Sequence, residues 1–236
     1  MTTLVALQPG YIPWLGFFDQ MRRSDVFIYY DDVQFDKNGW RNRNRIKTHR
    51  GPQWLSVPVR QSGRMGQRIC DVEIVRADAW AQRHLRSIRE SYAQAPFLRL
   101  YCDELAEILQ RDWHLLAELD IAVVALMCRW LGLGRRIFRS SELDIAGGKS
   151  ERLINLCRHV GADRYLSGNS ARDYLDTGLF AAANIAVEWQ EYAHPSYPQL
   201  HGAFVPFMST LDLLFNVGPE SLEVIARGAS ASACHG

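Results

Sequence analysis

The chain has 236 residues, of which 47% are hydrophobic and 22% charged, and its formal net charge at pH 7 is +1. This composition fits one large globular domain or two small ones, and the near-zero net charge gives no support to a general affinity for nucleic acids or membranes. The five cysteines include no C-x-x-C pair, so a zinc ribbon or thioredoxin-like motif is not indicated and reduced, structural thiols are expected. No signal-peptide pattern and no run of about 18 apolar residues occurs, so a cytoplasmic protein without membrane contact is expected.

The first thirty residues predict a strand, a helix and a second strand. The short apolar run at 2–7 ends at a Pro-Gly turn signal, which is typical of a buried strand. Pro13 suits the first turn of a helix, and apolar residues then recur at helical spacings as far as Arg23. The β-rich run at 26–30 follows. This order indicates a βαβ unit, which favours parallel pairing of its strands.

The rest of the chain predicts an α/β fold. "RNRIKT" and "QWLSVPV" are predicted as two strands around a turn, and "CDVEIV" at 70–75 as a further strand. Strands are also predicted in "RRIFRSSEL", "DRYLSG" and "IAVEWQEY", and helices in "SERLINLCRHVG" and "STLDLLFNVG". The prediction is a single domain at 1–228 with a Rossmann-like, mostly parallel sheet. It has a β-rich insertion after the second strand at about 33–76, a helical middle segment at about 79–133, and a flexible tail at 229–236.

Polar, aromatic or glycine-bearing turns follow each predicted strand. In an open parallel sheet, ligands bind outside the carboxyl ends of the strands. The residues at those positions are Gln8–Tyr11, Asp31-Asp32, Ser140-Ser141, Ser167–Asn169 and Tyr192–Pro198. A ligand-binding pocket is therefore predicted at this edge of the sheet, and Ser167 is one candidate for contact with the ligand.

The first turn and the paired carboxylates supply further candidates. Gln8, Tyr11 and Trp14 are predicted to bind substrate, since an amide directly after a buried strand can bind a base or a carbonyl group, although Trp14 also fits a core position. Asp31 and Asp32 can hold Mg²⁺ or accept protons. They can equally cap the next turn or pair with nearby arginines. Pairing or capping is favoured for Asp31, and Asp32 is a candidate catalytic base.

The stretch "GWRNRNRIK" carries four cations and two amides. Arginine binds phosphates and carboxylates through two parallel hydrogen bonds, and alternation along a strand places the arginines on one face and the asparagines on the other. A solvated basic edge strand is the competing interpretation, but the amides and flanking tryptophans favour an anion-binding surface. The candidate binding residues in this region are Gln34, Trp40, Arg41, Asn42, Arg43, Asn44 and Lys47.

Two later segments carry residue types that can bind an anion or accept a proton. "AGGKSERL" resembles the end of a phosphate loop, but Leu143 stands where the full pattern needs glycine, so a Walker A motif is rejected. The helix start after Gly148 can still attract an anion, or it is an ordinary capped helix. In "YAHPSYPQLHG" two prolines hold His194 and Tyr197; His194 is a candidate general base, or a structural histidine bonded to the backbone. Its spacing from His201 does not fit zinc, so no metal site is predicted.

Several motifs together resemble the WbqC-like protein family. They are "LQPGYIPWLGFFDQM", "DVFIYYDDVQFDKNGWRNRNRIKT", "WLSVPV", "YLSG" and "HPSYPQLHGAFVPFMSTLDLLFNVGP", which span about residues 4–225. The resemblance implies a role in assembling bacterial surface polysaccharides or secondary metabolites, by acyl or aminoacyl transfer to amino sugars or related molecules. The first βα unit also resembles class I synthetase-like folds, but Pro13–Gly16 replace their His-x-Gly-His signature, which disfavours adenylate chemistry.

The predicted function is a transferase. It moves an acyl or aminoacyl group from an activated carrier (CoA, a carrier protein or an aminoacyl-tRNA) to the amino group of a small molecule or amino sugar. The arginine–asparagine segment binds the carrier's phosphates, His194 or Asp32 accepts the proton of the attacking amine, and Asn42 or the Ser167-Gly168 backbone stabilises the oxyanion. No tightly bound cofactor is expected, because the activated donor is a cosubstrate.

Two other functions remain open from the sequence. The first is an ATP-dependent ligase or nucleotidyltransferase that holds Mg²⁺ at Asp31 and Asp32. The second is a non-catalytic module that binds a small molecule and presents it to partner enzymes.

Overall fold

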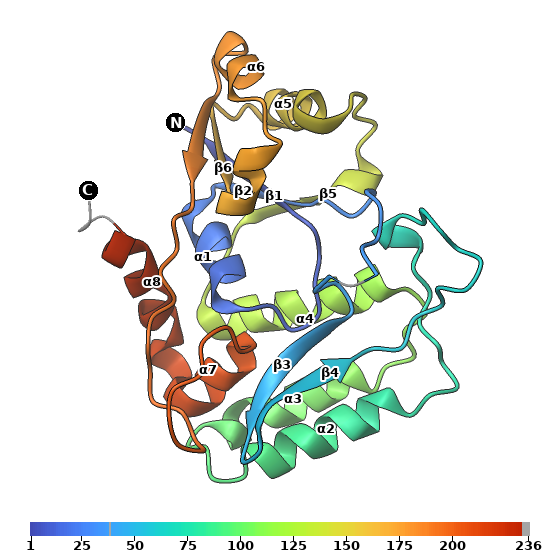
Figure 1. Ribbon diagram of the computed structural model, residues 1–236, viewed down its shortest axis with the longest axis vertical. Helices are drawn as coiled ribbons and strands as arrows, with labels where there is room; N and C mark the ends of the chain where they lie inside the picture. The colour runs from blue at the N-terminus through green and yellow to red at the C-terminus, as the bar shows by residue number, and fades with distance from the viewer. Residues whose placement is uncertain (38, 233–236) are drawn as a thin grey trace.

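A five-stranded parallel sheet forms the centre of the computed structural model, which describes residues 1–37 and 39–232 (Figure 1). The strand order is β5-β2-β1-β6-β7. In that order, the bounds are Arg136–Arg139, Val26–Tyr29, Thr3–Leu7, Arg164–Ser167 and Ala186–Trp189. The chain starts at the middle strand, builds outward to one side and then returns to build the other. The predicted α/β fold with a Rossmann-like parallel sheet is therefore confirmed, and the strand order reverses between β1 and β6.

Both faces of the sheet are buried. Leu4 of β1 lies opposite Val26 of β2, and these two side chains belong to one core cluster. Their neighbours in sequence, Val5 and Phe27, point into a second cluster on the other face. Strands buried on both faces have nearly continuous apolar sequences, which is why these strands were recognisable in the sequence.

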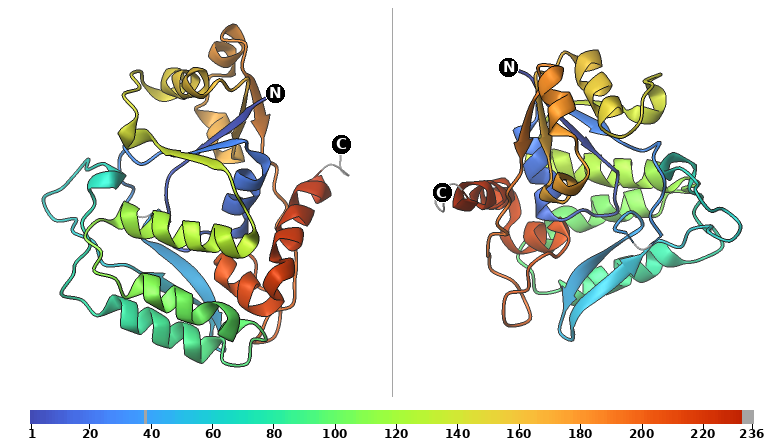
Figure 2. Two further views of the ribbon diagram at one scale, coloured as in Figure 1. Left: turned by 180° about the vertical axis from the view of Figure 1, so that it is seen from behind. Right: turned by 45° about the horizontal axis from the view of Figure 1, so that its top comes forward.

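Helices cover the two faces. α1 (Leu15–Arg23) and α4 (Leu116–Leu131) contribute to the core cluster that contains Phe27. α5 (Lys149–Val160) and α6 (Thr177–Ala182) pack on the opposite face. Figure 2 shows from behind that α4 runs between the sheet and the two helices that precede α4 in the chain.

The crossover from β2 to β5 holds the predicted insertion and the helical middle segment. The insertion contains a hairpin of β3 (Arg43–Thr48) and β4 (Gly51–Ser56). The predicted strand at 70–75 is wrong, because Ile69–Asp71 form the 3₁₀ turn η1 and the residues after it make only isolated bridges. The apolar alternation there arises because Val72 and Ile74 insert into the core. A β-rich insertion is thus not confirmed.

The remaining helices belong to the middle segment and to the end of the chain. The middle segment comprises α2 (Trp80–Ser91), α3 (Leu98–Leu109) and α4, and the chain ends with α7 (Thr210–Val217) and α8 (Ser221–Ser232) (Figure 1). Residues 229–232, predicted to lie in a flexible tail, continue α8, while 233–236, including Cys234, lie outside the described residues. The four cysteines that are described are free and buried. Within the same part of the chain, no helix is both long enough and apolar enough to span a bilayer.

Candidate functional site

A cavity of about 1310 Å³ opens at the point where the strand order reverses. Its lining includes Leu7, the last residue of β1, and Gln8 directly after it. It also includes Ser167, the last residue of β6, and Gly168 directly after it. Ligands of open α/β sheets bind in the crevice at this switch point. The volume exceeds that of a usual single-ligand pocket, so the cavity has room for two substrates or for one with a long tail.

The loop after β1 forms one wall and is held by the segment before β3. Arg41 Nη1 donates hydrogen bonds to the carbonyl oxygens of Gln8 at 3.0 Å and Pro9 at 3.3 Å. The backbone N–H of Tyr11 in turn donates to the carbonyl of Arg41 at 2.9 Å. Arg41 also lines the cavity, so one side chain both fixes the wall and contributes a positive charge to it.

Two close approaches complete this wall. Asn44 Nδ2 donates to the carbonyl of Ile12 at 2.9 Å. A Cβ added to Gly10 would lie only 3.1 Å from the carbonyl oxygen of Trp40, so glycine allows the two backbones to pass close together. Segments that are distant in sequence therefore form a single, well-supported surface.

Cations and exposed aromatic rings share the lining. Arg41, Arg45 and Lys149 are among the lining residues, as are Trp40 and Phe207, whose exposed fractions are 43% and 47%. The guanidinium of Arg45 lies 5.4 Å from the ring centroid of Trp40. Two carboxylates, Asp173 and Glu191, also line the cavity, and Glu191 forms an ion pair with Arg172 at 2.6 Å. The cations can attract an anionic ligand, and exposed rings can stack on planar groups.

The N-cap residue and one face of α1 supply a further part of the wall. Trp14, Phe17 and Gln20 all line the cavity, because residues three positions apart lie on the same side of a helix. The indole of Trp14 folds back over Gly16, since a Cβ on Gly16 would lie 2.3 Å from two atoms of that ring. The spacing of these three residues was the signal that could have identified Gln20 from the sequence.

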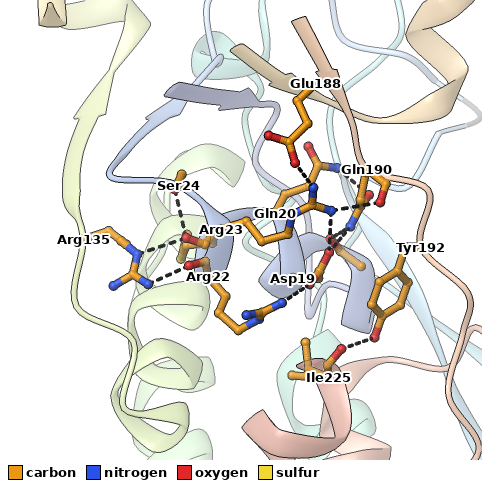
Figure 3. A network of polar contacts seen from close by, with 12 residues as sticks. Asp19, Gln20, Arg22, Arg23, Ser24, Arg135, Glu188, Gln190, Tyr192 and Ile225 are labelled. Carbon is orange, nitrogen blue, oxygen red and sulfur yellow. Dashed lines mark hydrogen bonds and ion pairs between the residues drawn. The ribbon is translucent and has the colours of Figure 1, made fainter. Parts of the chain in front are cut away.

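A network of amides and charges holds α1 in place (Figure 3). Gln190 Nε2 donates to the carbonyl of Gly16 at 2.7 Å and to Asp19 Oδ2 at 3.0 Å. Gln20 Nε2 donates to Gln190 Oε1 at 2.9 Å, and both glutamines line the cavity. Arg135 donates to carbonyl oxygens in the last turn of α1, where a cation also complements the helix dipole.

The structure brings some of the predicted site residues together and separates others. Those that line the cavity are Gln8, Trp14, Trp40, Arg41, Asn44 and Ser167. Those outside its lining are Tyr11, Asp32, Gln34, Asn42, Arg43, Lys47, His194 and Tyr197. Sequence reasoning missed Gln20, Gln190 and Phe207.

Several of the residues outside the lining support the fold. The hydroxyl of Tyr11 is buried and lies 2.9 Å from His84 Nδ1. Asn42 Nδ2 donates to the carbonyl of Val57 at 2.8 Å. Lys47 Nζ donates to the carbonyl of Ala203 at 2.6 Å. These polar groups make fixed contacts within the protein, as buried polar groups generally do.

Three more of these eight residues lie at the surface or in a buried cluster. Arg43 stacks over the exposed ring of Trp54 at 4.7 Å. Gln34 is exposed and makes an isolated bridge with Arg68. The hydroxyl of Tyr197 donates to Asp212 Oδ2 at 2.9 Å.

The Asp31–Asp32 pair is engaged by cations and hydroxyls. Asp31 is fully buried and accepts hydrogen bonds of 2.9 Å from Arg139 Nε and from both N and Oγ of Ser141. Asp32 forms an ion pair with Arg152 and accepts from Ser140 Oγ at 2.5 Å. These contacts favour the pairing interpretation and supply no observation in favour of Mg²⁺ binding there.

Asp32 nevertheless connects to the cavity. Burial raises the pKa of Asp32, but the hydrogen bonds from Arg152 and Ser140 outweigh burial, so the pKa lies below its usual value. The guanidinium of Arg152 lies 5.3 Å from the ring centroid of Tyr30, and Tyr30 lines the cavity. Asp32 thus helps to position the cavity wall through Arg152.

His194 lies one ring behind the wall. Its ring stacks on Trp14 at 6.3 Å and contacts Phe207 at 5.1 Å between centroids. His194 Nδ1 lies 3.0 Å from the carbonyl oxygen of Pro195, and because a carbonyl only accepts, Nδ1 carries the proton. The lone pair of the neutral ring is therefore on Nε2, which is buried with no partner among the described residues. Burial lowers the pKa of His194, which favours the neutral ring at pH 7.

Comparison with known proteins decides the family. The chain matches the WbqC-like protein family over residues 8–224. It belongs to that family. It is also 43% identical over 223 residues to the uncharacterized protein Rv1507c of Mycobacterium tuberculosis, an alignment that covers 94% of this chain and 96% of that protein. No solved structure matches the chain.

The resemblance seen in the motifs is confirmed by this match. In residues 1–37 and 39–232, no group of three or more His, Cys, Asp or Glu side chains is arranged to hold a metal ion.

Proposed function

We propose that this WbqC-like protein is a cytoplasmic transferase that moves an acyl or aminoacyl group from an activated carrier to the amino group of a small molecule such as an amino sugar. The observation that carries the proposal is the cavity at the switch point, whose lining combines Arg41, Arg45 and Lys149 with exposed aromatic rings. CoA, a carrier protein's phosphopantetheine and the end of a charged tRNA all carry phosphates. Cations bind such phosphates strongly.

In the proposed reaction, the nitrogen of the amine attacks the carbonyl carbon of the donor. A C–N bond forms, and the C–S bond of a thioester or the C–O bond of an ester breaks. The proton leaves the amine, passes to His194 Nε2 and then reaches the thiolate or alkoxide that departs. The turn after β6, at Ser167-Gly168, is assigned to stabilise the oxyanion.

His194 is preferred over Asp32 as the base. Its Nε2 has a lone pair without a partner, whereas the carboxylate of Asp32 is engaged by Arg152 and Ser140. The rings of Trp14 and Phe207 cover His194 on the cavity side. The amine therefore reaches Nε2 only when one of these rings turns aside, which couples proton transfer to the presence of substrate.

The proposal is tested by following thiol release from acetyl-CoA with UDP-glucosamine as the amine. Wild-type protein is expected to release CoA only when both are present. His194→Ala is expected to lower kcat at least 100-fold, the lower end of what general acid–base catalysis contributes. Quenching of tryptophan fluorescence on binding should persist, because Trp40 remains in the cavity lining.

His159→Ala is the matched control, because His159 is exposed on α5. It should retain full activity. Normal turnover in His194→Ala would remove His194 from the mechanism, and the absence of thiol release by wild-type protein with this donor–amine pair would contradict the transferase proposal for these probes.

A further inference from the structure

One atom of the Gln20 amide has no partner, and Gln20 lies in the wall of the cavity. The residue is only 6% exposed, and its Oε1 is buried with no hydrogen-bond donor among the described residues. A buried acceptor without a donor costs about 1–3 kcal/mol. Such an atom beside a large cavity indicates that the donor comes from a bound molecule.

The orientation of this amide follows from its neighbours. The amide atom of Gln190 that lies 2.7 Å from the carbonyl oxygen of Gly16 and 3.0 Å from Asp19 Oδ2 faces two acceptors, so it is the nitrogen. Gln190 therefore presents its oxygen to Gln20, and the atom of Gln20 that lies 2.9 Å away must be nitrogen. The remaining atom of Gln20 is fixed as an acceptor (Figure 3).

The charges behind the network hold this orientation. Asp19 is fully buried and accepts from Arg22 at 2.9 Å, with Arg23 at 3.7 Å. Both arginines form ion pairs with Asp19, and a carboxylate is a hydrogen-bond acceptor in such a pair. A flip of the Gln190 amide would place its oxygen against this carboxylate, so the acceptor on Gln20 is preserved.

The position of Gln20 separates it from the aromatic part of the wall. It lies six residues beyond Trp14, which corresponds to about 9 Å along α1. A Cβ added to Gly168 would lie 3.5 Å from Gln20 Nε2. Ser167 is the last residue of β6 and Gly168 follows it, while Gln190 directly follows β7. We call Gln20, Gln190, Ser167 and Gly168 the amide corner; all four line the cavity.

We infer that Gln20 Oε1 in the amide corner is a specificity-determining acceptor for an O–H or N–H group on the ring of a sugar carried on a diphosphate. The inference rests on the proposed function, because it assumes that the cavity binds the substrate. An acceptor lone pair repels phosphate oxygens, so the diphosphate lies away from Gln20 in the same cavity. The hydroxyl or amino groups of the sugar then supply the donor that Gln20 lacks.

The test compares UDP-glucosamine with UDP by isothermal titration calorimetry. Gln20→Met keeps the length of the side chain and removes the acceptor. It is expected to weaken UDP-glucosamine binding about tenfold, which corresponds to about 1.4 kcal/mol, and to leave UDP binding unchanged. Gln53→Met is the matched control, because Gln53 is an exposed glutamine on β4 outside the cavity lining, and it should change neither affinity.

The outcomes separate the inference from the proposed function. The inference is overturned, and the proposed function stands, if wild-type protein and Gln20→Met bind UDP-glucosamine with equal affinity. The same conclusion follows if the substitution weakens the binding of UDP as much as the binding of UDP-glucosamine. If wild-type protein binds neither molecule, both fail. Should Gln20→Met not fold, the comparison of the two molecules on wild-type protein still tests the inference, because UDP-glucosamine should bind more tightly than UDP; equal affinity for the two would overturn the inference.

Discussion

Replacing Gly16 with alanine is a direct test of how the cavity wall is built. The new Cβ would lie 2.3 Å from two carbon atoms of the Trp14 indole, whereas non-bonded carbons prefer about 3.5–4.0 Å. The ring must therefore move by roughly 1 Å or more. Because Trp14 borders the open cavity, the ring can turn into that space.

The expected cost is moderate. Turning the indole breaks its edge-to-face contact with Tyr192 at 5.7 Å and its stacking on His194 at 6.3 Å. Each aromatic contact is worth about 0.5–1.5 kcal/mol, and alanine gains up to about 1 kcal/mol over glycine in a helix. The free energy of unfolding should therefore fall by about 1 kcal/mol. Binding of UDP-glucosamine should weaken at least tenfold, because the displaced ring occupies part of the site.

Urea unfolding followed by circular dichroism measures the first effect, and calorimetric titration the second. Gly134→Ala is the matched control, since a Cβ at Gly134 has no atom within 4 Å, and it should change neither quantity. If Gly16→Ala has the stability, the tryptophan emission and the affinity of wild-type protein, then the indole does not pack over Gly16 and the description of this wall is wrong.

Two further substitutions test the polar contacts outside the cavity. Arg152→Met leaves the largely buried Asp32 without its cation and should destabilise the protein by about 2 kcal/mol or more at pH 7. Because the pKa of Asp32 is lowered from 3.8 in the folded protein, its stabilising contribution is complete above that value and is lost as the pH falls through the folded pKa. Urea unfolding should show that the difference in free energy of unfolding between Arg152→Met and wild-type protein is smaller at pH 3 than at pH 7. An equal difference at the two pH values would contradict this. Asp212→Asn places an N–H₂ group against the hydroxyls of Tyr92 and Tyr197, which donate to Asp212 at 2.7 and 2.9 Å. It should cost about 1–3 kcal/mol of stability without changing UDP-glucosamine affinity, and a change in affinity at full stability would refute the assignment of this cluster to the fold.

The fold was predictable where a pattern had one physical cause. Strands buried on both faces leave apolar runs, and α4 and α5 end at Gly132 and Gly161 with positive φ, a signal that glycine gives directly. The prediction of a strand at 70–75 was wrong because its alternation of apolar and polar residues has another cause. Single side chains, Val72 and Ile74, insert into the core there. Periodicity reports burial, and burial does not require a strand partner.

The site was predictable in its location and less so in its members. The rule that ligands bind at the carboxyl ends of parallel strands led to Gln8 and Ser167, which do line the cavity. It could not show that Asp32 is paired with Arg152, a partner about 120 residues away. Nor could it show that the ring of Trp14 packs on His194, or that Gln20 on a helix face lines the cavity, because both depend on how α1 packs against the loop after β7.

The two neighbours of β1 become available at very different times during synthesis. Leu4 pairs with Val26 on one side and with Tyr165 on the other, so one edge of the middle strand stays open until the ribosome has passed residue 165. Contacts this remote slow folding, and an apolar strand with an open edge invites pairing between nascent chains. Truncated chains that end before β6 are therefore expected to aggregate.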